Sequence, residues 1–593
     1  MNEKHILMRP NLCLTWFSSQ ANQPVSYSHI FSRFFFTSLY LAVLVCCSSL
    51  AVSAQTTQQG QQGQQWQQQG QQGQQGPYFD DPPFLDQGLW NYDDWKVYGG
   101  NLHNTHSSFF EFKINARNAS RLSVKWSFTT GGDMPATPTI EGGALYVPDS
   151  KSPTSNSGGN LFKLDTRDGS VIWTTKISDY TGNAASFSRN SPAIAEDRII
   201  LGDQASGTVM AVDKYTGNLL WKTLVDPHPA ALITNSPVVV GDRIYVGVSS
   251  KEEGFVIANI GYQFTFRGSV NALDLHTGQI LWKTYTVPEG YTGGAVWGSS
   301  FPIDRRRGTL YATTGNNYSI PDSAATCVQQ APTSQAQLAC LSPEDYVDSI
   351  LSLDLATGQI RWGNRVQGAD FFNAACFFGA AFPCPNPQGP DYDFASGANL
   401  FTVFSRHGIF DVVGAGQKSG HYWALNPDNG HVLWSKQVGP GGLLGGIQWG
   451  AATDGRRIYV AVANSNHISY PLAPSNSVTT NGGSWAALDP ATGEILWQIP
   501  ATGQDPRNPD LTAQALGQVS AANGVVYAGS MSGDMVALNA ENGSILWQFA
   551  SGGSVICGPS IVDGTLYWGS GYANFIFGIP NNKLYAFTVT RGR

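Results

Sequence analysis

The sequence predicts an all-β protein, an eight-bladed β-propeller with four-stranded blades. Three observations carry this prediction. A hairpin pattern of strand, polar turn, strand and terminal Trp recurs along the chain, eight Trp residues end such patterns, and the two ends of the repeat region each hold half of one pattern. Charged residues make up only 13% of the chain and Gly is abundant, which is typical of a turn-rich β protein.

The hairpin pattern is clearest in Val270–Trp282, which reads VNALDLHTGQILW. Its first part has the alternation of a half-buried strand. Asp274 and Gly278 belong to a polar turn in which Gly278 is free to adopt a positive φ, and a second strand then ends on Trp282. The same pattern recurs in six further segments: Phe162–Trp173, Val209–Trp221, Ile350–Trp362, Tyr422–Trp434, Trp485–Trp497 and Met535–Trp547.

An incomplete copy stands at each end of the repeats. Trp126 closes the strand Leu122–Trp126 without a preceding strand and turn, whereas Lys583–Thr588 supplies a first strand with no turn and Trp after it. We therefore expect the C-terminal strand to pair with the N-terminal one and close the ring, which removes an exposed sheet edge. Each terminal Trp should pack on the backbone of the next blade and donate its N–H to a carbonyl there.

The remaining strands and the insertions follow from the spacing of the repeats. Each hairpin is preceded by two more strands around a Gly-Asp or Asp-Gly turn, as in Ser236–Val248 and Gly558–Ser570. The spacing between terminal Trp residues lengthens between Trp221 and Trp497. Because insertions in propellers fall in loops on the faces, we expect the functional site in these central blades.

Residues 1–54 are predicted to form an export leader. Arg33 precedes the apolar run Phe34–Val45, and the small residues of Ala51–Ala54 suit cleavage before the next residue. An uncleaved signal anchor is the alternative. With cleavage, the protein is expected to be secreted, or periplasmic in a bacterium, and free of the membrane.

Residues 55–90 are predicted to be a disordered linker, because their Gln- and Gly-rich composition offers little apolar surface to bury. The propeller is assigned to residues 91–593. The formal net charge of -8 gives no electrostatic support for a nucleic-acid partner.

Five cysteines lie outside the leader. In a secreted protein, Cys327–Cys340 and Cys376–Cys384 are plausible local disulfides, with other pairings open and Cys557 as the odd thiol.

The opening segment Trp95–Thr105, WKVYGGNLHNT, and the LDxxTGxxxW hairpins carry a resemblance. Over about Trp95–Thr588 the chain resembles the quinoprotein alcohol dehydrogenases, which use pyrroloquinoline quinone (PQQ), and is most similar to their polyvinyl-alcohol-dehydrogenase-like branch. The resemblance implies an enzyme that oxidises a secondary, polyol or polymeric alcohol with PQQ and Ca²⁺. The chain has no CxxCH haem-attachment motif, so the electrons would pass to an external acceptor.

The resemblance also implies the residues that bind the cofactor. Trp297, in a Gly-rich segment, matches the aromatic floor on which the quinone stacks. Arg189 and Thr234 match positions that bind the PQQ carboxylates, and Ser250 matches a hydroxyl that reaches PQQ. Lys418 matches a cation beside the quinone oxygens, where it would stabilise charge on the reduced cofactor.

The metal ligands and the base are implied in the same way. Glu253, Asn316 and Asp393 match the ligands of the ion, and carboxylate and amide oxygens suit Ca²⁺. Asp393 is also the expected base, which takes the alcohol proton while a hydride passes to the C5 carbonyl of PQQ, polarised by the ion. Asp370 and Asp391 are rival candidates for the base, because an insertion precedes this segment.

One departure from the family stands out. Many relatives hold two adjacent cysteines over the cofactor, whereas this chain has Ala184–Ser188 at the corresponding place. The hairpin repeat also occurs in propellers that are not enzymes. The alternative function is therefore a non-catalytic propeller that binds a glycan or a protein partner.

Overall fold

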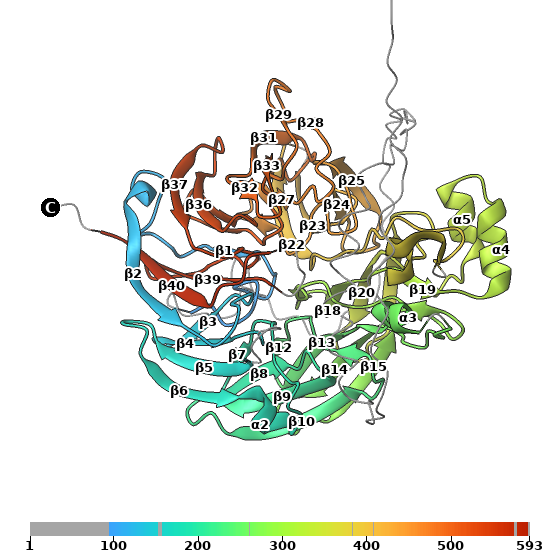
Figure 1. Cartoon of the computed structure of the whole chain (residues 1–593), viewed down its shortest axis with the longest axis horizontal. Coiled ribbons are helices and arrows are strands. Elements are labelled where there is room, and N and C mark those ends of the chain that lie inside the picture. Colours follow the sequence, from blue (N-terminus) through green and yellow to red (C-terminus); the bar gives the residue numbers. More distant parts are fainter. Residues whose placement is uncertain are drawn as a thin grey trace, which may run out of the picture. The chain divides into compact units, whose positions relative to one another are not determined.

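Eight sheets, each with a core of four antiparallel strands, follow one another around a ring (Figure 1), so the predicted eight-bladed propeller is confirmed. The first four sheets along the chain comprise β3 (Thr139–Glu141), β4 (Ala144–Pro148), β5 (Asn160–Asp165) and β6 (Val171–Lys176); β7 (Ala193–Ala195), β8 (Arg198–Gly202), β9 (Gly207–Asp213) and β10 (Leu219–Asp226); β12 (Val238–Val240), β13 (Arg243–Ser250), β14 (Ser269–Asp274) and β15 (Ile280–Tyr285); and β17 (Ile303–Asp304), β18 (Thr309–Thr313), β20 (Ser349–Asp354) and β21 (Ile360–Arg365).

The remaining four sheets have the same plan. They comprise β22 (Asn399–Ser405), β23 (Gly408–Gly416), β24 (His421–Leu425) and β25 (Val432–Gln437); β26 (Ala452–Thr453), β27 (Ile458–Val462), β30 (Ser484–Leu488) and β31 (Ile495–Pro500); β34 (Ser520–Ala522), β35 (Val525–Gly529), β36 (Asp534–Asn539) and β37 (Ile545–Ala550); and β38 (Ser560–Val562), β39 (Thr565–Ser570), β40 (Lys583–Val589) and β2 (Leu122–Thr129).

This computed structural model describes residues 94–590 apart from 152–156, 260, 382–383, 407 and 574–577. The predicted leader and linker lie outside the described residues. Within the described part of the chain, no helix has both the length and the apolar character needed to cross a bilayer.

The ring closes between the two ends of the repeat region, as the sequence predicts. The N-terminal strand β2 pairs antiparallel with the C-terminal strand β40, with Ser123 opposite Thr588 and Thr129 opposite Lys583. Strand β40 pairs on its other side with β39. One sheet is thus built from both ends, and neither strand is left with an open edge at the seam.

The terminal Trp residues dock on the next blade. The indole N–H of Trp282 donates to the carbonyl of Leu355 at 3.2 Å, and that of Trp547 donates across the seam to Leu122 at 2.9 Å. The Gly of each LDxxTG turn lies under the ring of the preceding blade: a Cβ at Gly358, where φ is +74°, would be 2.4 Å from Cε3 of Trp282. The motif therefore needs Gly both for its positive φ and for contact with the Trp ring.

The segment that opens with Trp95 forms a strap across several blades. Backbone hydrogen bonds join it in turn to the innermost strands, from Ile140 in β3 through Ile303 in β17 to Ala521 in β34. Apolar side chains of neighbouring sheets pack together, as do Ile200, Val246 and Leu310 in one fully buried cluster. Stability thus comes from contacts between blades.

Two short strands extend blade sheets: β1 (Ser107–Ser108) pairs parallel with β34, and β11 (Ala231–Leu232) pairs antiparallel with β13. The other short elements lie outside the blades. The strands among them are β16 (Thr292–Gly293), β19 (Asn317–Ser319), β28 (Tyr470–Pro471), β29 (Thr479–Thr480), β32 (Gln504–Asp505) and β33 (Asn508–Thr512). The helices are η1 (Ala119–Arg121), α2 (Ile177–Thr181), η2 (Glu252–Gly254), α3 (Phe255–Ala258), α4 (Asp322–Gln330), α5 (Ser334–Cys340) and η3 (Ala374–Ala381), where η denotes a 3₁₀ helix.

Both expected disulfides are present. Cys327–Cys340 joins α4 to α5, and Cys376–Cys384 lies in the insertion that contains η3. Cys557 is a free, buried thiol.

Candidate active site

Three of the predicted site residues meet at one carboxylate. The indole N–H of Trp297 donates to Oδ2 of Asp393 at 3.1 Å, and Nζ of Lys418 donates to the same oxygen at 3.0 Å. The Lys418 ammonium lies 5.2 Å from the centre of the Trp297 ring. An aromatic face, a cation and a carboxylate from three separate segments of the chain are thereby joined.

Gly315 makes this close approach possible. A Cβ at Gly315 would be 2.8 Å from Oδ1 of Asp393 and 3.2 Å from Nε1 of Trp297. Real Cβ atoms essentially never come within 3.0 Å of another heavy atom, so any other residue would push the carboxylate away from the indole. The Thr-Thr-Gly-Asn segment therefore needs its Gly for the site.

Lys418 also pairs with a second carboxylate, that of Asp391, at 2.9 Å. Burial by itself lowers the pKa of a lysine, but the carboxylates of Asp391 and Asp393 outweigh it and raise the pKa of Lys418 above its ordinary value. Lys418 is therefore a permanent cation.

The side chain of Asn316 is oriented by its neighbours. Its amide Nδ2 donates to the carbonyls of Asn317 at 3.1 Å and Phe372 at 2.9 Å. Its backbone N–H donates to Oδ1 of Asp393 at 2.7 Å. Because both amide hydrogens are engaged, the side-chain oxygen remains as an acceptor, which is the orientation that a cation ligand requires.

The adjacent carboxylates Glu252 and Glu253 have different surroundings. Glu252 is fully buried and accepts hydrogen bonds from the backbone N–H of Thr265 at 2.8 Å and of Phe266 at 2.9 Å. Burial raises the pKa of Glu253 to about 8, opposed by Lys418 and reinforced by Asp393. Glu252 thus anchors the loop, whereas Glu253 is influenced by the charges of Lys418 and Asp393.

The site carries more buried carboxylates than cations. Burial raises the pKa of Asp391 well above its ordinary value. The negative charges of Asp393 and Glu253 raise this pKa further, whereas Lys418 lowers it without cancelling the effect. A divalent cation bound by hard oxygen ligands would relieve this excess. The residues present therefore fit a Ca²⁺-type ion.

Arg189 and Thr234 line an adjoining cavity of about 30 Å³, together with Trp449. The buried Nε of Arg189 has no hydrogen-bond partner among the described residues, so it suits a carboxylate of a ligand. The hydroxyl of Ser250 accepts the backbone N–H of Glu252 at 2.8 Å.

Trp449 is a site residue that the sequence analysis missed. Its ring meets Trp297 edge to face at 5.6 Å, and the Arg189 guanidinium lies 5.5 Å from it. It therefore joins the cavity of Arg189 to the carboxylate cluster. The sequence does contain evidence for this role, because GGIQWG at Gly445–Gly450 repeats the pattern of GGAVWG at Gly293–Gly298.

The two rival candidates for the base have hydrogen-bond partners of their own. Both carboxylate oxygens of Asp370 accept backbone N–H groups, of Asp391 at 3.0 Å and of Tyr392 at 2.7 Å, while Asp391 pairs with Lys418. Burial raises the pKa of Asp370 to about 6, and Asp348 lies against it with its own pKa raised well above the ordinary value.

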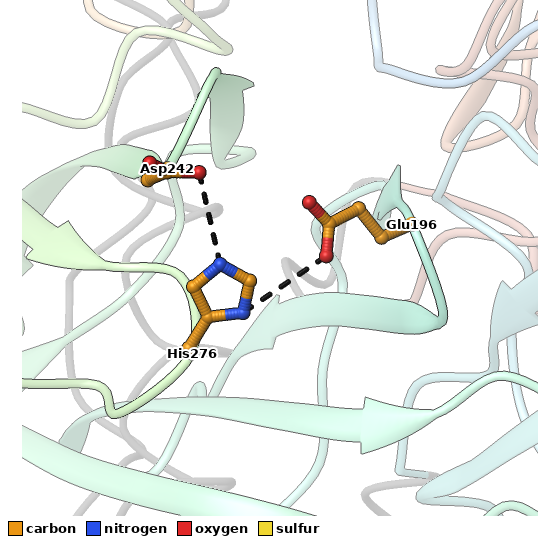
Figure 2. Close-up of side chains that lie close together, drawn as sticks. All are labelled: Glu196, Asp242 and His276. Carbon is orange, nitrogen blue, oxygen red and sulfur yellow. Dashed lines mark ion pairs between the residues drawn. The ribbon is translucent and has the colours of Figure 1, made fainter.

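A separate acidic cluster lies on exposed turns (Figure 2). Across the described residues, Glu196, Asp242 and His276 are the one His, Cys, Asp or Glu group whose ligand atoms lie within 4.8 Å of one another. Nδ1 of His276 is 3.9 Å from Glu196 and Nε2 is 3.7 Å from Asp242, so each carboxylate faces a different ring nitrogen. This is the geometry of a solvent-exposed ion pair, which contributes little to stability.

The chain is similar to several known proteins. A family model described as outer membrane protein assembly factor BamB matches residues 113–313 and 266–593. A polyvinylalcohol dehydrogenase of Pseudomonas sp. is 30% identical over 544 residues, which cover 84% of this chain and 77% of that protein. Another, from Sphingopyxis sp. (strain 113P3), is 28% identical over 523 residues, with 80% and 73% covered.

The fold is also found among solved structures. The quinohemoprotein alcohol dehydrogenase of Comamonas testosteroni superimposes with a TM-score of 0.63 at 20% identity, over 86% of this chain and 83% of that one. The fold and the sequence relatives together define a quinoprotein-type propeller. The chain belongs to the PQQ-dependent quinoprotein alcohol dehydrogenase family, in its polyvinyl-alcohol-dehydrogenase-like branch.

Proposed function

We propose that the protein is a secreted PQQ- and Ca²⁺-dependent dehydrogenase that oxidises a secondary, polyol or polymeric alcohol and passes the electrons to an external acceptor. The observation that carries this proposal is the hydrogen bonding of one buried carboxylate, Asp393, to the indole of Trp297 and the ammonium of Lys418. Similarity to two polyvinylalcohol dehydrogenases supports an alcohol substrate. The predicted leader and the two disulfides support secretion.

The cofactor and the ion would be held by the predicted residues. Trp297 supplies the stacking face, and Arg189, Thr234 and Ser250 supply donors for the carboxylates of PQQ. The ion would take oxygen ligands from Glu253, Asn316 and Asp393. When bound, PQQ would supply the two-electron acceptor that oxidation of an alcohol requires.

The protein's own contribution is proton transfer and electrostatics. Asp393 takes the proton of the substrate hydroxyl as general base. Its carboxylate is fixed by three donors, from Trp297, Lys418 and the backbone of Asn316, so it does not need to reorient during the reaction. Lys418 stabilises the negative charge that develops beside it.

The test is dye reduction by purified protein with PQQ and Ca²⁺, assayed with a secondary alcohol, a sugar alcohol and polyvinyl alcohol. Asp393→Asn should lower kcat by about 10³-fold, because a positioned base contributes roughly that much, while PQQ affinity stays within about threefold. Asp149→Asn is the matched control, since Asp149 is a buried carboxylate that accepts backbone N–H groups in another blade. Full turnover in the Asp393 variant would remove Asp393 as the base, and PQQ binding without oxidation of any alcohol would contradict the enzyme function.

A further inference from the structure

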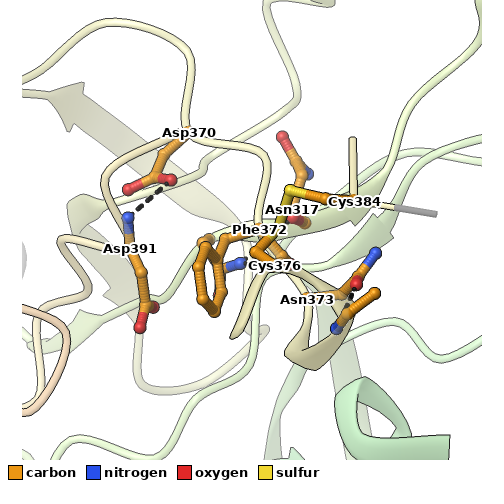
Figure 3. Close-up of a disulfide and its surroundings, with 9 residues drawn as sticks. Asn317, Asp370, Phe372, Asn373, Cys376, Cys384 and Asp391 are labelled. Carbon is orange, nitrogen blue, oxygen red and sulfur yellow. Dashed lines mark hydrogen bonds between the residues drawn. A yellow bond between two sulfur atoms is a disulfide. The ribbon is translucent and has the colours of Figure 1, made fainter. Parts of the chain in front are cut away.

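Asp370 is a buried residue that holds the segment leading to the base (Figure 3). The residue is 1% exposed. Oδ1 accepts the N–H of Asp391 at 3.0 Å and Oδ2 accepts the N–H of Tyr392 at 2.7 Å. Two successive backbone groups, immediately before Asp393, are thus fixed by one carboxylate.

The backbone beside Asp370 holds the amide ligand segment. The carbonyl of Asp370 accepts the N–H of Asn317 at 3.0 Å, and the N–H of Phe372 donates to the carbonyl of Asn317 at 3.0 Å. The carbonyl of Phe372 accepts Nδ2 of Asn316 at 2.9 Å, which orients that amide. Residues 370–372 therefore link the ligand segment directly to the base segment.

The insertion that follows is tied back to Asp370. The Cys376–Cys384 disulfide closes it, and the N–H of Gly389 donates to the carbonyl of Phe371 at 2.7 Å. A Cβ at Gly389 would be 2.1 Å from Oδ1 of Asp370, so the returning chain fits tightly against the carboxylate. Helix η3 of the insertion packs against η2, which carries Glu253.

We propose that Asp370 is a positioning residue, which sets the separation between the carboxylate of Asp393 and the side-chain oxygen of Asn316. This inference rests on the proposed function, because those two groups are the proposed cation ligands. Asp370 hydrogen-bonds to the backbone of one segment through its side chain and to the other through its own carbonyl. It acts through its neighbours, because its oxygens are directed at backbone N–H groups.

The test is cation binding to the cofactor-free protein, with Tb³⁺ as the probe. Nε1 of the Trp297 indole lies 3.1 Å from Oδ2 of Asp393, which is a proposed cation ligand. A Tb³⁺ ion bound there is therefore close enough to be excited through the indole ring. Asp370→Asn keeps the shape and one carbonyl oxygen but sets an amide NH₂ against the second N–H. We expect its Tb³⁺ affinity to fall by about tenfold or more, as for other residues that orient metal ligands. Asp149→Asn should leave that affinity within about twofold.

Turnover gives a second readout. Asp370→Asn should lower kcat by about tenfold with KM within about twofold, and added Ca²⁺ should restore part of the loss. Asp370→Ala removes the whole carboxylate group. If that variant does not fold, the isosteric Asp370→Asn variant alone decides whether Asp370 positions the ligands.

The inference would be overturned if Asp370→Asn bound Tb³⁺ and turned over as the wild-type protein does. It would also be overturned if the wild-type protein bound no Tb³⁺. The Tb³⁺ comparison uses neither PQQ nor alcohol. Absence of alcohol oxidation in the wild type therefore contradicts the proposed function alone, and the role of Asp370 is still decided.

Discussion

Substitution of Gly543 by Ala should destabilise the propeller by a predictable amount. Gly543 has a φ of +74°, and a Cβ there would be 2.6 Å from Cε3 of Trp497. The positive φ costs about 1 kcal/mol for a residue with a Cβ. Displacement of the ring costs about 1 kcal/mol in packing and about 1 kcal/mol for the hydrogen bond from the Trp497 indole to Ala540, which is 3.0 Å long. The expected loss in free energy of unfolding is about 3 kcal/mol.

Gly524 in the same blade is the matched control. Its φ is +78° and no atom lies within 4 Å of the position of a Cβ, so Gly524→Ala should cost only about 1 kcal/mol for the positive φ. Urea denaturation of both variants, followed by fluorescence, measures the difference. Equal losses in the two variants would show that contact between the Trp ring and the glycine contributes nothing, and would refute the account of the repeat.

Two further predictions concern buried charges. Lys418→Met should lower the free energy of unfolding of the cation-free protein by about 3 kcal/mol, because two buried carboxylates lose their partner, and Ca²⁺ should recover part of it in thermal melts. No loss would show that those carboxylates are neutral. Asp505→Asn should also cost about 3 kcal/mol at pH 7, because His467 and Arg507 outweigh burial and hold the pKa of Asp505 below its ordinary value. A lowered pKa stabilises the fold above the unfolded value of about 4 and loses this effect as the pH falls through the folded pKa, so the cost should shrink in melts at pH 3. A cost independent of pH would contradict this assignment.

Much of the fold could be predicted from the sequence, because the information is local and repeated. The LDxxTG turn and the Trp that follows encode a hairpin and its docking site within about a dozen residues, so the blades could be counted. The half patterns at Trp126 and Lys583–Thr588 fixed the closure of the ring. The strap that begins at Trp95 could not be predicted, since its partners, such as Ile303 and Ala521, are distant in sequence.

The site was predictable to the extent that its residues match family positions. Trp297, Asp393 and Lys418 do come together. The different surroundings of Glu252 and Glu253 could not be predicted from their adjacency, because they depend on which side of the loop is packed.

Two other features of the site depend on contacts between distant segments. Trp449 was missed even though its hexapeptide repeats that of Trp297, because only the ring contact identifies it as part of the site. The hydrogen bonds from the backbone to the Asp370 carboxylate depend on how the disulfide-closed insertion returns to the site. The sequence does not specify that path.

The most direct test of the central claim is calorimetric titration of the purified protein with PQQ, with Ca²⁺ present and with Ca²⁺ chelated. If the buried carboxylates hold an ion beside a cofactor on Trp297, PQQ should bind with a Kd of about 1 µM or lower in the presence of Ca²⁺. Chelation should weaken that binding by at least about tenfold, because the ion offsets the carboxylates that face the anionic cofactor. The absence of PQQ binding at about 100 µM under both conditions would contradict the account and favour a non-catalytic propeller.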